Sequence, residues 1–113
     1  MHEMALAQGT LDIVLDNAAK HGATKVTRVK LVVGQMTEVV PDSLRFCFDA
    51  LAKGTLAEGA ELEIEITPLL GSCRDCQNEF AIERFRFQCP ACGSAGVEII
   101  SGRELRVDQL EVD

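Results

Sequence analysis

The chain contains no tryptophan and no tyrosine, and basic residues are scarce relative to acidic ones. Among its 113 residues, 11 are Lys or Arg and 18 are Asp or Glu, so the net charge is -7. Because an acidic surface repels phosphate backbones, this balance disfavours nonspecific nucleic-acid binding. No apolar run is long enough to cross a bilayer, and no signal-peptide pattern opens the chain. We therefore expect a cytoplasmic protein that binds neither nucleic acid nor membrane.

Apolar residues make up 47% of the chain, and its only aromatic residues are five Phe. A chain of this size buries roughly two thirds of the surface that its unfolded form exposes, which is enough for a real core. The length suits one domain, or one domain plus a small module. In a reducing cytoplasm, the five cysteines are expected to be thiols or metal ligands rather than disulfides.

Two segments show the periodicity of amphipathic helices. Residues 4–21 carry an apolar stripe at steps of three and four, and Gly22 supplies a helix stop. Residues 41–53 repeat this spacing after Pro41 and Asp42, which suit a helix start. The stripe positions are Met4, Ala7, Leu11, Val14 and Ala18, then Leu44, Cys47, Phe48 and Leu51. Cys47 is therefore expected to be a small buried hydrophobe rather than a reactive thiol.

Three segments show the alternation of β-strands, namely 25–33, 61–67 and the tail 104–112. The positions expected to alternate toward the core are Val29, Leu31 and Val33, Leu62, Ile64 and Ile66, and Leu105 and Val107. Because a lone terminal strand is unstable, we expect the tail to rejoin the sheet of the first half. This predicts an α+β fold with a discontinuous domain, residues 1–68 and 103–113, interrupted by a module at 69–102.

Four of the five cysteines form two C-x-x-C pairs, Cys73 with Cys76 and Cys89 with Cys92, separated by 12 residues. Four thiolates suit tetrahedral Zn²⁺ and close its coordination shell, which indicates structural rather than catalytic zinc. Gly93 can adopt the positive φ that turns backbone N–H groups toward sulfur. Because a segment of this size cannot build its own core, the metal is expected to supply its folding energy.

The residues between the two pairs include Phe80, Ile82, Phe85 and Phe87, which are expected to form a small hairpin beside the metal. A redox dithiol is the alternative interpretation of a C-x-x-C pair. That interpretation requires the pair to follow a strand and open a helix, and neither pair has such a context.

The chain begins Met1-His2-Glu3. The amine of Met1 with the backbone and imidazole nitrogens of His2 would present three nitrogens in one plane, which suits Ni²⁺ or Cu²⁺. A histidine at position two leaves one planar site open, and an open site suits a carrier that hands its metal on. Glu3 can add its backbone nitrogen or its carboxylate. The alternative is that His2 is merely exposed and Glu3 complements a helix dipole.

These features together resemble the HypA/HybF family of nickel metallochaperones for [NiFe]-hydrogenase maturation. The resemblance rests on MHE, VVGQMTEVVPDSLRFCFDALAKGT, ELEIEI and the two C-x-x-C pairs, and it spans essentially the whole chain. It implies two helices on a small three-stranded sheet with an inserted zinc-ribbon module. It also implies that Met1, His2 and Glu3 hold Ni(II), whereas Cys73, Cys76, Cys89 and Cys92 hold Zn(II).

The resemblance further implies partners, namely a HypB-type GTPase and the hydrogenase large subunit, and some members also serve urease. Some members place a zinc-module histidine near the nickel, but residues 69–102 contain no histidine. The fourth nickel ligand therefore stays open among Glu38, Asp42, an accessory protein and water. The oligomeric state is also open between monomer and dimer, with exchange of the terminal strand as one route.

The resulting hypothesis is a non-enzymatic nickel carrier. The alternative is a zinc-ribbon protein-interaction or transcription-associated module without a nickel function. Ribbons that bind nucleic acid present basic or aromatic faces. The cysteine segment instead balances its arginines with acidic residues, namely Arg74, Arg84 and Arg86 against Asp75, Glu79, Glu83 and Glu98.

Overall fold

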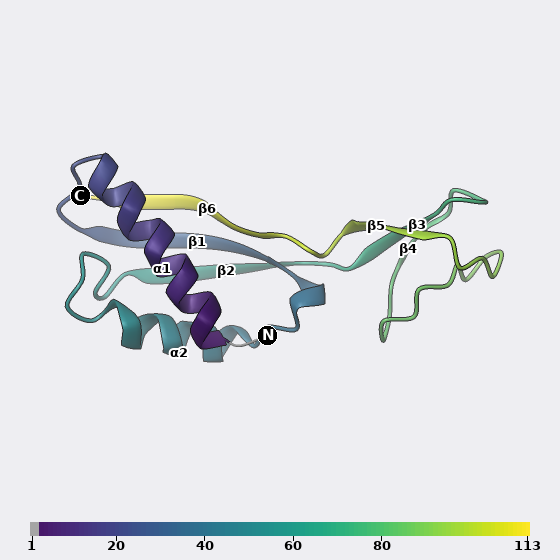
Figure 1. The fold of residues 1–113 in the computed structure, drawn as a ribbon, viewed down its shortest axis with the longest axis horizontal. Coiled ribbons are helices and arrows are strands. Elements are labelled where there is room, and N and C mark those ends of the chain that lie inside the picture. Colours follow the sequence, from purple (N-terminus) through teal and green to yellow (C-terminus); the bar gives the residue numbers. More distant parts are fainter. Residues whose placement is uncertain (1–2) are drawn as a thin grey trace.

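Two helices, α1 (Glu3–Lys20) and α2 (Pro41–Ala52), pack on a three-stranded sheet in the computed structural model, which describes residues 3–113 (Figure 1). The sheet consists of β1 (Val26–Gly34), β2 (Glu61–Thr67) and β6 (Leu105–Val112). These bounds confirm the predicted helices and strands to within one residue at most ends. In the described part of the chain, neither helix is long and apolar enough to span a bilayer.

Strand β1 lies at the centre of this first sheet, whose order is β2-β1-β6. It pairs parallel with β2 and antiparallel with β6, and the β1–β6 ladder shifts register between Val26 and Arg28 and between Lys30 and Leu31. The predicted return of the C-terminal tail to the first sheet is therefore confirmed.

The core lies between the helices and one face of β1. Alternate residues of β1 point to this face because side chains alternate across a strand. The buried cluster consists mainly of Leu6, Ala7, Leu11, Val14 and Ala18 from α1, Leu44, Phe48 and Ala52 from α2, and Val29, Leu31, Val33 and Leu62 from the sheet. The predicted stripes of the two helices contribute Ala7, Leu11, Val14, Ala18, Leu44 and Phe48 to this core.

Some positions predicted to face the core are more exposed than expected. Met4 is exposed and Cys47 is half-buried, because both border an open hollow where the two helices begin. Ile66 and Leu105 are also exposed, although both pair with the buried Val33. They lie on the two outer strands, on either side of Val33 in the central strand.

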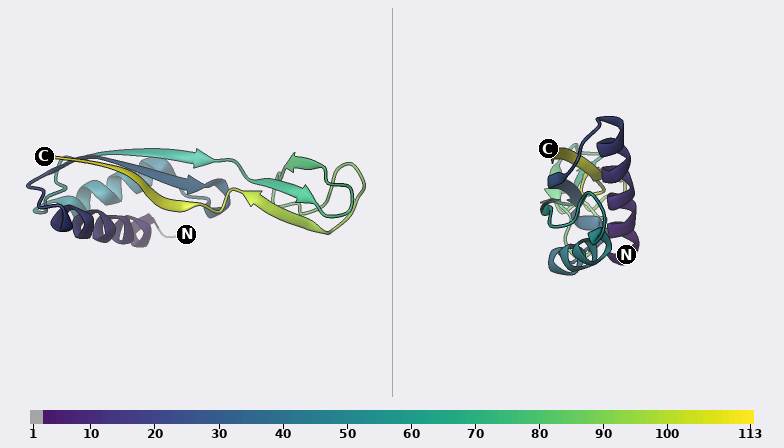
Figure 2. Two further views of the ribbon diagram at one scale, coloured as in Figure 1. Left: turned by 90° about the horizontal axis from the view of Figure 1, so that it is seen from above. Right: turned by 90° about the vertical axis from the view of Figure 1, so that its left-hand side faces the viewer.

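The molecule is elongated, with extents of 55 × 25 × 16 Å. A second sheet follows the first along its long axis (Figure 2). It contains β3 (Leu70–Cys73), β4 (Glu79–Ala81) and β5 (Val97–Ser101) in the order β4-β3-β5, with both ladders antiparallel. Two helices on a three-stranded sheet with an inserted ribbon-like segment is the architecture predicted from the sequence.

Hydrogen bonds tie the two sheets together where the chain passes between them. The Met36 N–H, in the short 3-10 helix η1 (Gln35–Thr37), donates to the Gly102 carbonyl oxygen at 2.9 Å. The Leu69 N–H donates to the Gln35 Oε1 at 2.8 Å. Gly102 has φ +110°, and a Cβ there would collide with the backbone of Leu69. Only glycine permits this close crossing of the two segments.

Candidate metal centres

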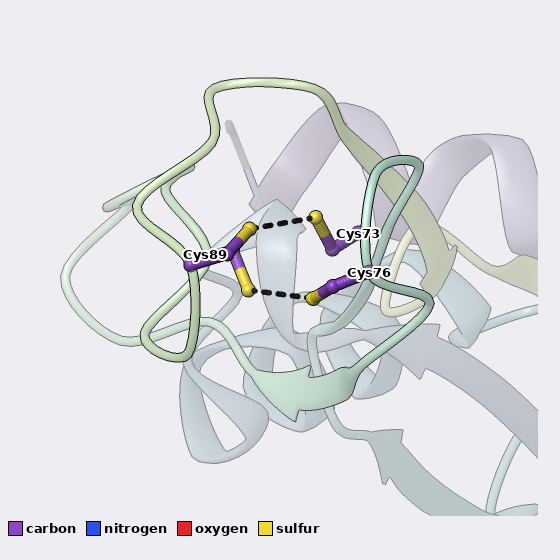
Figure 3. Close-up of side chains that lie close together, drawn as sticks. Cys73, Cys76 and Cys89 are labelled. Carbon is purple, nitrogen blue, oxygen red and sulfur yellow. Dashed lines mark hydrogen bonds between the residues drawn. The ribbon is translucent and has the colours of Figure 1, made fainter.

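The thiols of the two C-x-x-C pairs converge at the far end of the second sheet. Their four sulfur atoms all lie within 4.8 Å of one another. Figure 3 shows the labelled thiols pointing into the space between the β3–β4 turn and the loop that precedes β5. The Sγ atoms of Cys73 and Cys92 are 3.5 Å apart, as are those of Cys76 and Cys89.

This spacing fits a metal rather than a disulfide. A tetrahedral ion with Zn–S bonds of about 2.3 Å places its sulfur ligands roughly 3.8 Å apart. A disulfide requires about 2.05 Å. Cys73 is 1% exposed and Cys89 is 2% exposed, so two sulfur donors are buried together. The four-cysteine cluster thus suits a tetrahedral metal ion such as Zn²⁺.

The first pair lies in a tight turn at the end of β3. The Cys73 N–H donates to the Asn78 carbonyl oxygen at 2.9 Å, and the Gln77 N–H donates to the Cys73 carbonyl oxygen at 2.8 Å. Gln77 has φ +64°, the left-handed conformation that the turn requires. This turn brings the Cys76 sulfur back toward the Cys73 sulfur.

The second pair repeats the same turn without a strand before it. The Cys89 N–H donates to the Ser94 carbonyl oxygen, and the Gly93 N–H donates to the Cys89 carbonyl oxygen, both at 2.9 Å. Gly93 has φ +77°, which confirms the positive φ predicted at this position. A hydrogen bond from the Ser94 hydroxyl to the Asp75 carboxylate joins the two turns.

Backbone N–H groups in both turns stabilise thiolates. Burial disfavours the charged form of Cys89, but the N–H groups of Cys92 and Ala91 outweigh it and lower the pKa of Cys89 to about 6. The backbone N–H of Cys76 likewise lowers the pKa of Cys73. The first cysteine of each pair is therefore prepared to bind a cation as a thiolate.

The second cysteine of each pair holds its proton more firmly while no cation is present. The Ser94 N–H lowers the pKa of Cys92, but the Cys73 thiol and burial outweigh it and raise that pKa to about 12. The Asn78 N–H lowers the pKa of Cys76, but its neighbouring thiols and burial raise it overall. Because crowded thiolates repel one another, full ionisation of the cluster requires a bound cation.

The predicted hairpin between the two cysteine pairs is wrong. Of the residues between the pairs, only Glu79–Ala81 forms a strand. This strand pairs antiparallel with β3, which precedes it in the chain, and not with another strand between the pairs. Arg84 and Phe85 have φ +53° and +56°, so a left-handed turn ends the extended segment. Ile82 is buried against Gly71, whereas Phe85 and Phe87 are exposed. The turn prevents a return strand from pairing with β4.

The predicted nickel residues Met1 and His2 lie outside the described residues. Glu3 begins α1, and it borders an open hollow of about 550 Å³. The other residues around this hollow are Met4, Asp42, Ser43, Phe46 and Cys47. The starts of the two helices therefore face the same space, with a carboxylate contributed by each helix (Figure 1). The sequence left Asp42 open as one of several candidates for a nickel ligand, and the hollow brings its helix start beside Glu3.

The candidates for a further nickel ligand differ in position. The Asp42 side chain is 97% exposed, and its carboxylate lies 3.1 Å from Nη1 of Arg45. Glu38 follows η1 in the left-handed conformation, with φ +57°, and does not border the hollow. Asp42 is therefore the carboxylate that shares the hollow with Glu3.

Comparisons with known proteins agree with this arrangement. Residues 1–112 match the HypA family, described as hydrogenase/urease nickel incorporation, metallochaperone. The chain is 47% identical to the hydrogenase maturation factor HypA of Geotalea uraniireducens over all 113 residues, and this match covers 100% of both chains. It is 46% identical to the HypA of Chlorobaculum tepidum, again over 100% of both chains.

The fold also matches solved structures. The solution structure of the Ni metallochaperone HypA from Helicobacter pylori superposes with a TM-score of 0.70 at 25% identity, covering 99% of this chain and 97% of that one. A second HypA solution structure gives a TM-score of 0.72 at 25% identity, covering 99% of this chain and 96% of that one. The chain therefore belongs to the HypA family of nickel metallochaperones and maturation factors, which are not enzymes.

Proposed function

We propose that this protein binds Ni(II) at its N-terminus through Met1, His2 and Glu3 and delivers it to maturing [NiFe] hydrogenase. The single observation that carries the proposal is the hollow in which Glu3 of α1 faces Asp42 of α2. Together with the planar nitrogen donors of the first two residues, it forms an exposed site from which a partner can take the metal. Urease is the second candidate client, since the family description includes urease nickel incorporation.

We propose Asp42 as the further nickel ligand. Its carboxylate is almost fully exposed and borders the same hollow as Glu3. Its ion pair with Arg45 spans one helical turn on an exposed surface, so it holds the carboxylate only weakly. The Asp42 side chain is therefore free to turn toward a metal.

We propose that Cys73, Cys76, Cys89 and Cys92 hold a structural Zn(II). When bound, the ion would supply the folding energy that the small second sheet lacks. The backbone N–H groups of the two turns would stabilise the thiolates, and the Asp75–Ser94 hydrogen bond would hold the turns in register. We assign residues 1–68 and 103–113 to the nickel domain and residues 69–102 to the zinc domain.

The proposed partners are a HypB-type GTPase and the hydrogenase large subunit, and the proposed location is the cytoplasm. Their support is the family description, since incorporating nickel into hydrogenase requires contact with the maturation machinery. The acidic chain, with its net charge of -7, also disfavours a nucleic-acid partner.

The experiment is a Ni²⁺ titration of untagged, zinc-loaded protein, followed by calorimetry and visible absorption. His2→Ala is the test variant. His21→Ala is its matched control, because His21 is the only other histidine and lies at the opposite end of α1. We expect one tight site and the d–d absorption band of square-planar Ni²⁺. Both should be lost in His2→Ala and retained in His21→Ala.

Equal nickel binding by wild type and His2→Ala would overturn the proposal and favour a zinc-ribbon adaptor without a nickel function. Asp42→Asn tests the additional ligand separately. We expect it to weaken binding and shift the d–d band while leaving the nitrogen-based site in place. An unchanged band and affinity would remove Asp42 from the ligand set and leave water or an accessory protein in its place.

A further inference from the structure

The loop that connects β4 to the second cysteine pair alternates arginine with phenylalanine. Residues 83–88 read Glu-Arg-Phe-Arg-Phe-Gln, and we call them the Arg–Phe loop. Every residue of this loop is exposed. In Figure 1 the loop extends away from the second sheet, on the side where α2 lies beside the first. The hydrophobic core contains none of its residues, so packing in that core does not explain its aromatic side chains.

The arginines of the chain fall into two groups. Those on α2 and the first sheet all form ion pairs with carboxylates, namely Arg28, Arg45 and Arg106. Those between β2 and β6 form no ion pair within residues 3–113, namely Arg74, Arg84, Arg86 and Arg103. The acidic residues of the cysteine segment therefore balance its arginines in number but do not pair with them. These guanidinium groups remain available to carboxylates of a partner.

Two of these arginines share one hollow. Arg84 and Arg86 line a space of about 260 Å³, to which Phe80 and Pro90 contribute apolar walls. Glu83 adds a carboxylate to the same hollow but pairs with neither arginine in the described structure. The hollow therefore carries an excess of positive charge on a chain whose net charge is -7. It is complementary to a negatively charged group.

The backbone of the Arg–Phe loop is strained where it presents these side chains. The Arg86 N–H donates to the Glu83 carbonyl oxygen at 3.0 Å, and the two residues between them, Arg84 and Phe85, have φ +53° and +56°. Positive φ at both central positions is the conformation of a type I′ turn, which Asn and Gly favour. Bulky side chains rarely adopt it. Strained residues of this kind cluster where proteins clamp ligands.

The aromatic rings of the loop point to a macromolecule rather than to a small free anion. Phe85 and Phe87 are 44% and 38% exposed, next to the arginines that line the hollow. Arginine and aromatic residues are enriched in protein–protein interfaces, whereas lysine is depleted. The Arg–Phe loop contains both enriched types and no lysine. Its composition is that of an interface.

We propose that the Arg–Phe loop docks an acidic segment of a partner protein. Arg84 and Arg86 bind a carboxylate of that segment in the hollow through charge-assisted hydrogen bonds. Phe85 and Phe87 pack against an apolar side chain beside it. None of these residues borders the hollow of Glu3 and Asp42, so a partner docked here does not occupy the proposed nickel site.

The surroundings of the loop favour a short acidic segment over nucleic acid or an anionic membrane. A DNA duplex carries one negative charge per about 1.7 Å of its axis, so it would extend beyond the two arginines over acidic surface. The exposed Glu79 and Glu98 belong to that surface. Four bound thiolates exceed the charge of Zn²⁺, which would make the neighbouring cluster negative as well. An anionic lipid surface would meet the same repulsion.

The test titrates the full, zinc-loaded chain with a panel of short synthetic peptides, in which Asp or Glu flanks Leu or Phe, and follows amide NMR spectra. We expect saturable shifts at residues 83–88 that weaken with added salt, because exposed charges are screened. The same peptides with Lys in place of the acidic residues should cause none. Arg84→Ala with Arg86→Ala should weaken binding by ~10-fold or more. Arg103→Ala is the matched control, since Arg103 is also without an ion pair in residues 3–113 but lies outside this hollow.

The aromatic residues and the turn are tested in the same assay. Phe85→Ala with Phe87→Ala should weaken peptide binding, whereas Phe46→Ala, which removes an exposed ring from α2, should not. Arg84→Asn with Phe85→Gly suits a type I′ turn and should slow amide exchange at Arg86, which closes the turn, while it weakens binding. A purely structural role would not give these opposite effects. The zinc content of each variant shows that its cluster is intact.

Three results would overturn the proposal. The first is the absence of shifts with every acidic peptide, or equal shifts with the lysine peptides. The second is binding of free glutamate as tight as that of the peptides, which would make the hollow a site for free anions only. The third is tighter binding of a DNA duplex or of phosphatidylserine vesicles through the same arginines. The double arginine variant should bind Ni²⁺ as wild type does, so docking and nickel binding are tested independently.

Discussion

The Thr67 hydroxyl donates a hydrogen bond to the Glu104 carboxylate at 2.8 Å, although 37 positions separate these residues in the chain. Thr67 ends the strand by which the chain leaves the first sheet, and Glu104 precedes the strand by which it returns. The same carboxylate oxygen accepts the Gly102 N–H at 2.7 Å. One ionised side chain thus joins the outgoing and returning segments.

The Glu104 bond predicts a pH-dependent contribution to stability. The Thr67 hydroxyl, followed by backbone N–H groups, lowers the pKa of Glu104 from the ordinary value of 4.5. A lowered folded-state pKa stabilises the fold fully above the unfolded value, and this stabilisation is lost as the pH falls through the folded value. The advantage of wild type over Glu104→Gln in melting temperature should therefore shrink below about pH 4.5.

Melting curves of both proteins, recorded by circular dichroism from neutral to acidic pH, check this prediction. Glu58→Gln is the matched control, since Glu58 is an exposed glutamate in the loop between α2 and β2. Its melting curves should follow those of wild type at every pH. Parallel curves for wild type and Glu104→Gln would show that the carboxylate contributes nothing specific to the junction.

A second prediction concerns the crossing at Gly102. Its φ of +110° and its contact with the Leu69 backbone leave no room for a side chain. Gly102→Ala should therefore destabilise the protein by about 1–3 kcal/mol. Gly9→Ala is the control with the opposite expected sign, because Gly9 lies inside α1 with open space around it. It should stabilise by about 0.5–1 kcal/mol. Urea unfolding of the two variants compares these values directly.

A third prediction contrasts two neighbouring phenylalanines on α2. Phe48 is fully buried in the core, and Phe46 is 74% exposed. Phe48→Ala should cost about 3–5 kcal/mol, because it removes packed atoms and leaves a cavity. Phe46→Ala should change the free energy of unfolding by less than about 0.5 kcal/mol. Equal effects in denaturant unfolding would mean that the helix is packed by a different face.

A fourth prediction concerns metal removal. Chelation at neutral pH should release one zinc per chain and expose four thiols to a thiol reagent, because the second sheet has little core of its own. Amides of α1 and α2 should keep their protection from hydrogen exchange, since their core contains no cysteine of the cluster. Cys73→Ser should reproduce the loss, whereas Cys47→Ser is the control and should retain zinc. Zinc bound at full stoichiometry by Cys73→Ser would contradict the assigned ligands.

The sequence predicted the helices and strands of the first sheet well, because most of these elements bury one face more than the other. The periodicity of residues such as Leu11, Val14, Phe48 and Val29 follows directly from that asymmetry. The cysteine spacing likewise predicted the cluster, since two tight turns are enough to bring four sulfur atoms together. In both cases, the determining interactions are local in the chain.

Burial at the edges of the sheet and the path of the chain between the cysteine pairs were predicted poorly. Ile66 and Leu105 alternate as expected, yet both are exposed on the outer strands beside the buried Val33. The apolar residues near Phe85 suggested a hairpin, whereas two consecutive left-handed residues end it. Asp42 stayed one of several candidates for the nickel site, because its place beside Glu3 depends on the packing of α1 on α2, which no local pattern encodes.

The position of β6 in the sheet has a consequence for biosynthesis. Its partner β1 is synthesised early. The paired residues Val33 and Leu105 are separated in the sequence by the whole cysteine segment. The growing chain therefore presents all four cysteines of the cluster before its first sheet can close. Because contacts of large sequence separation form slowly, the cluster has time to capture its metal while the N-terminal half still waits for its last strand. The order of synthesis thus favours metal capture before closure.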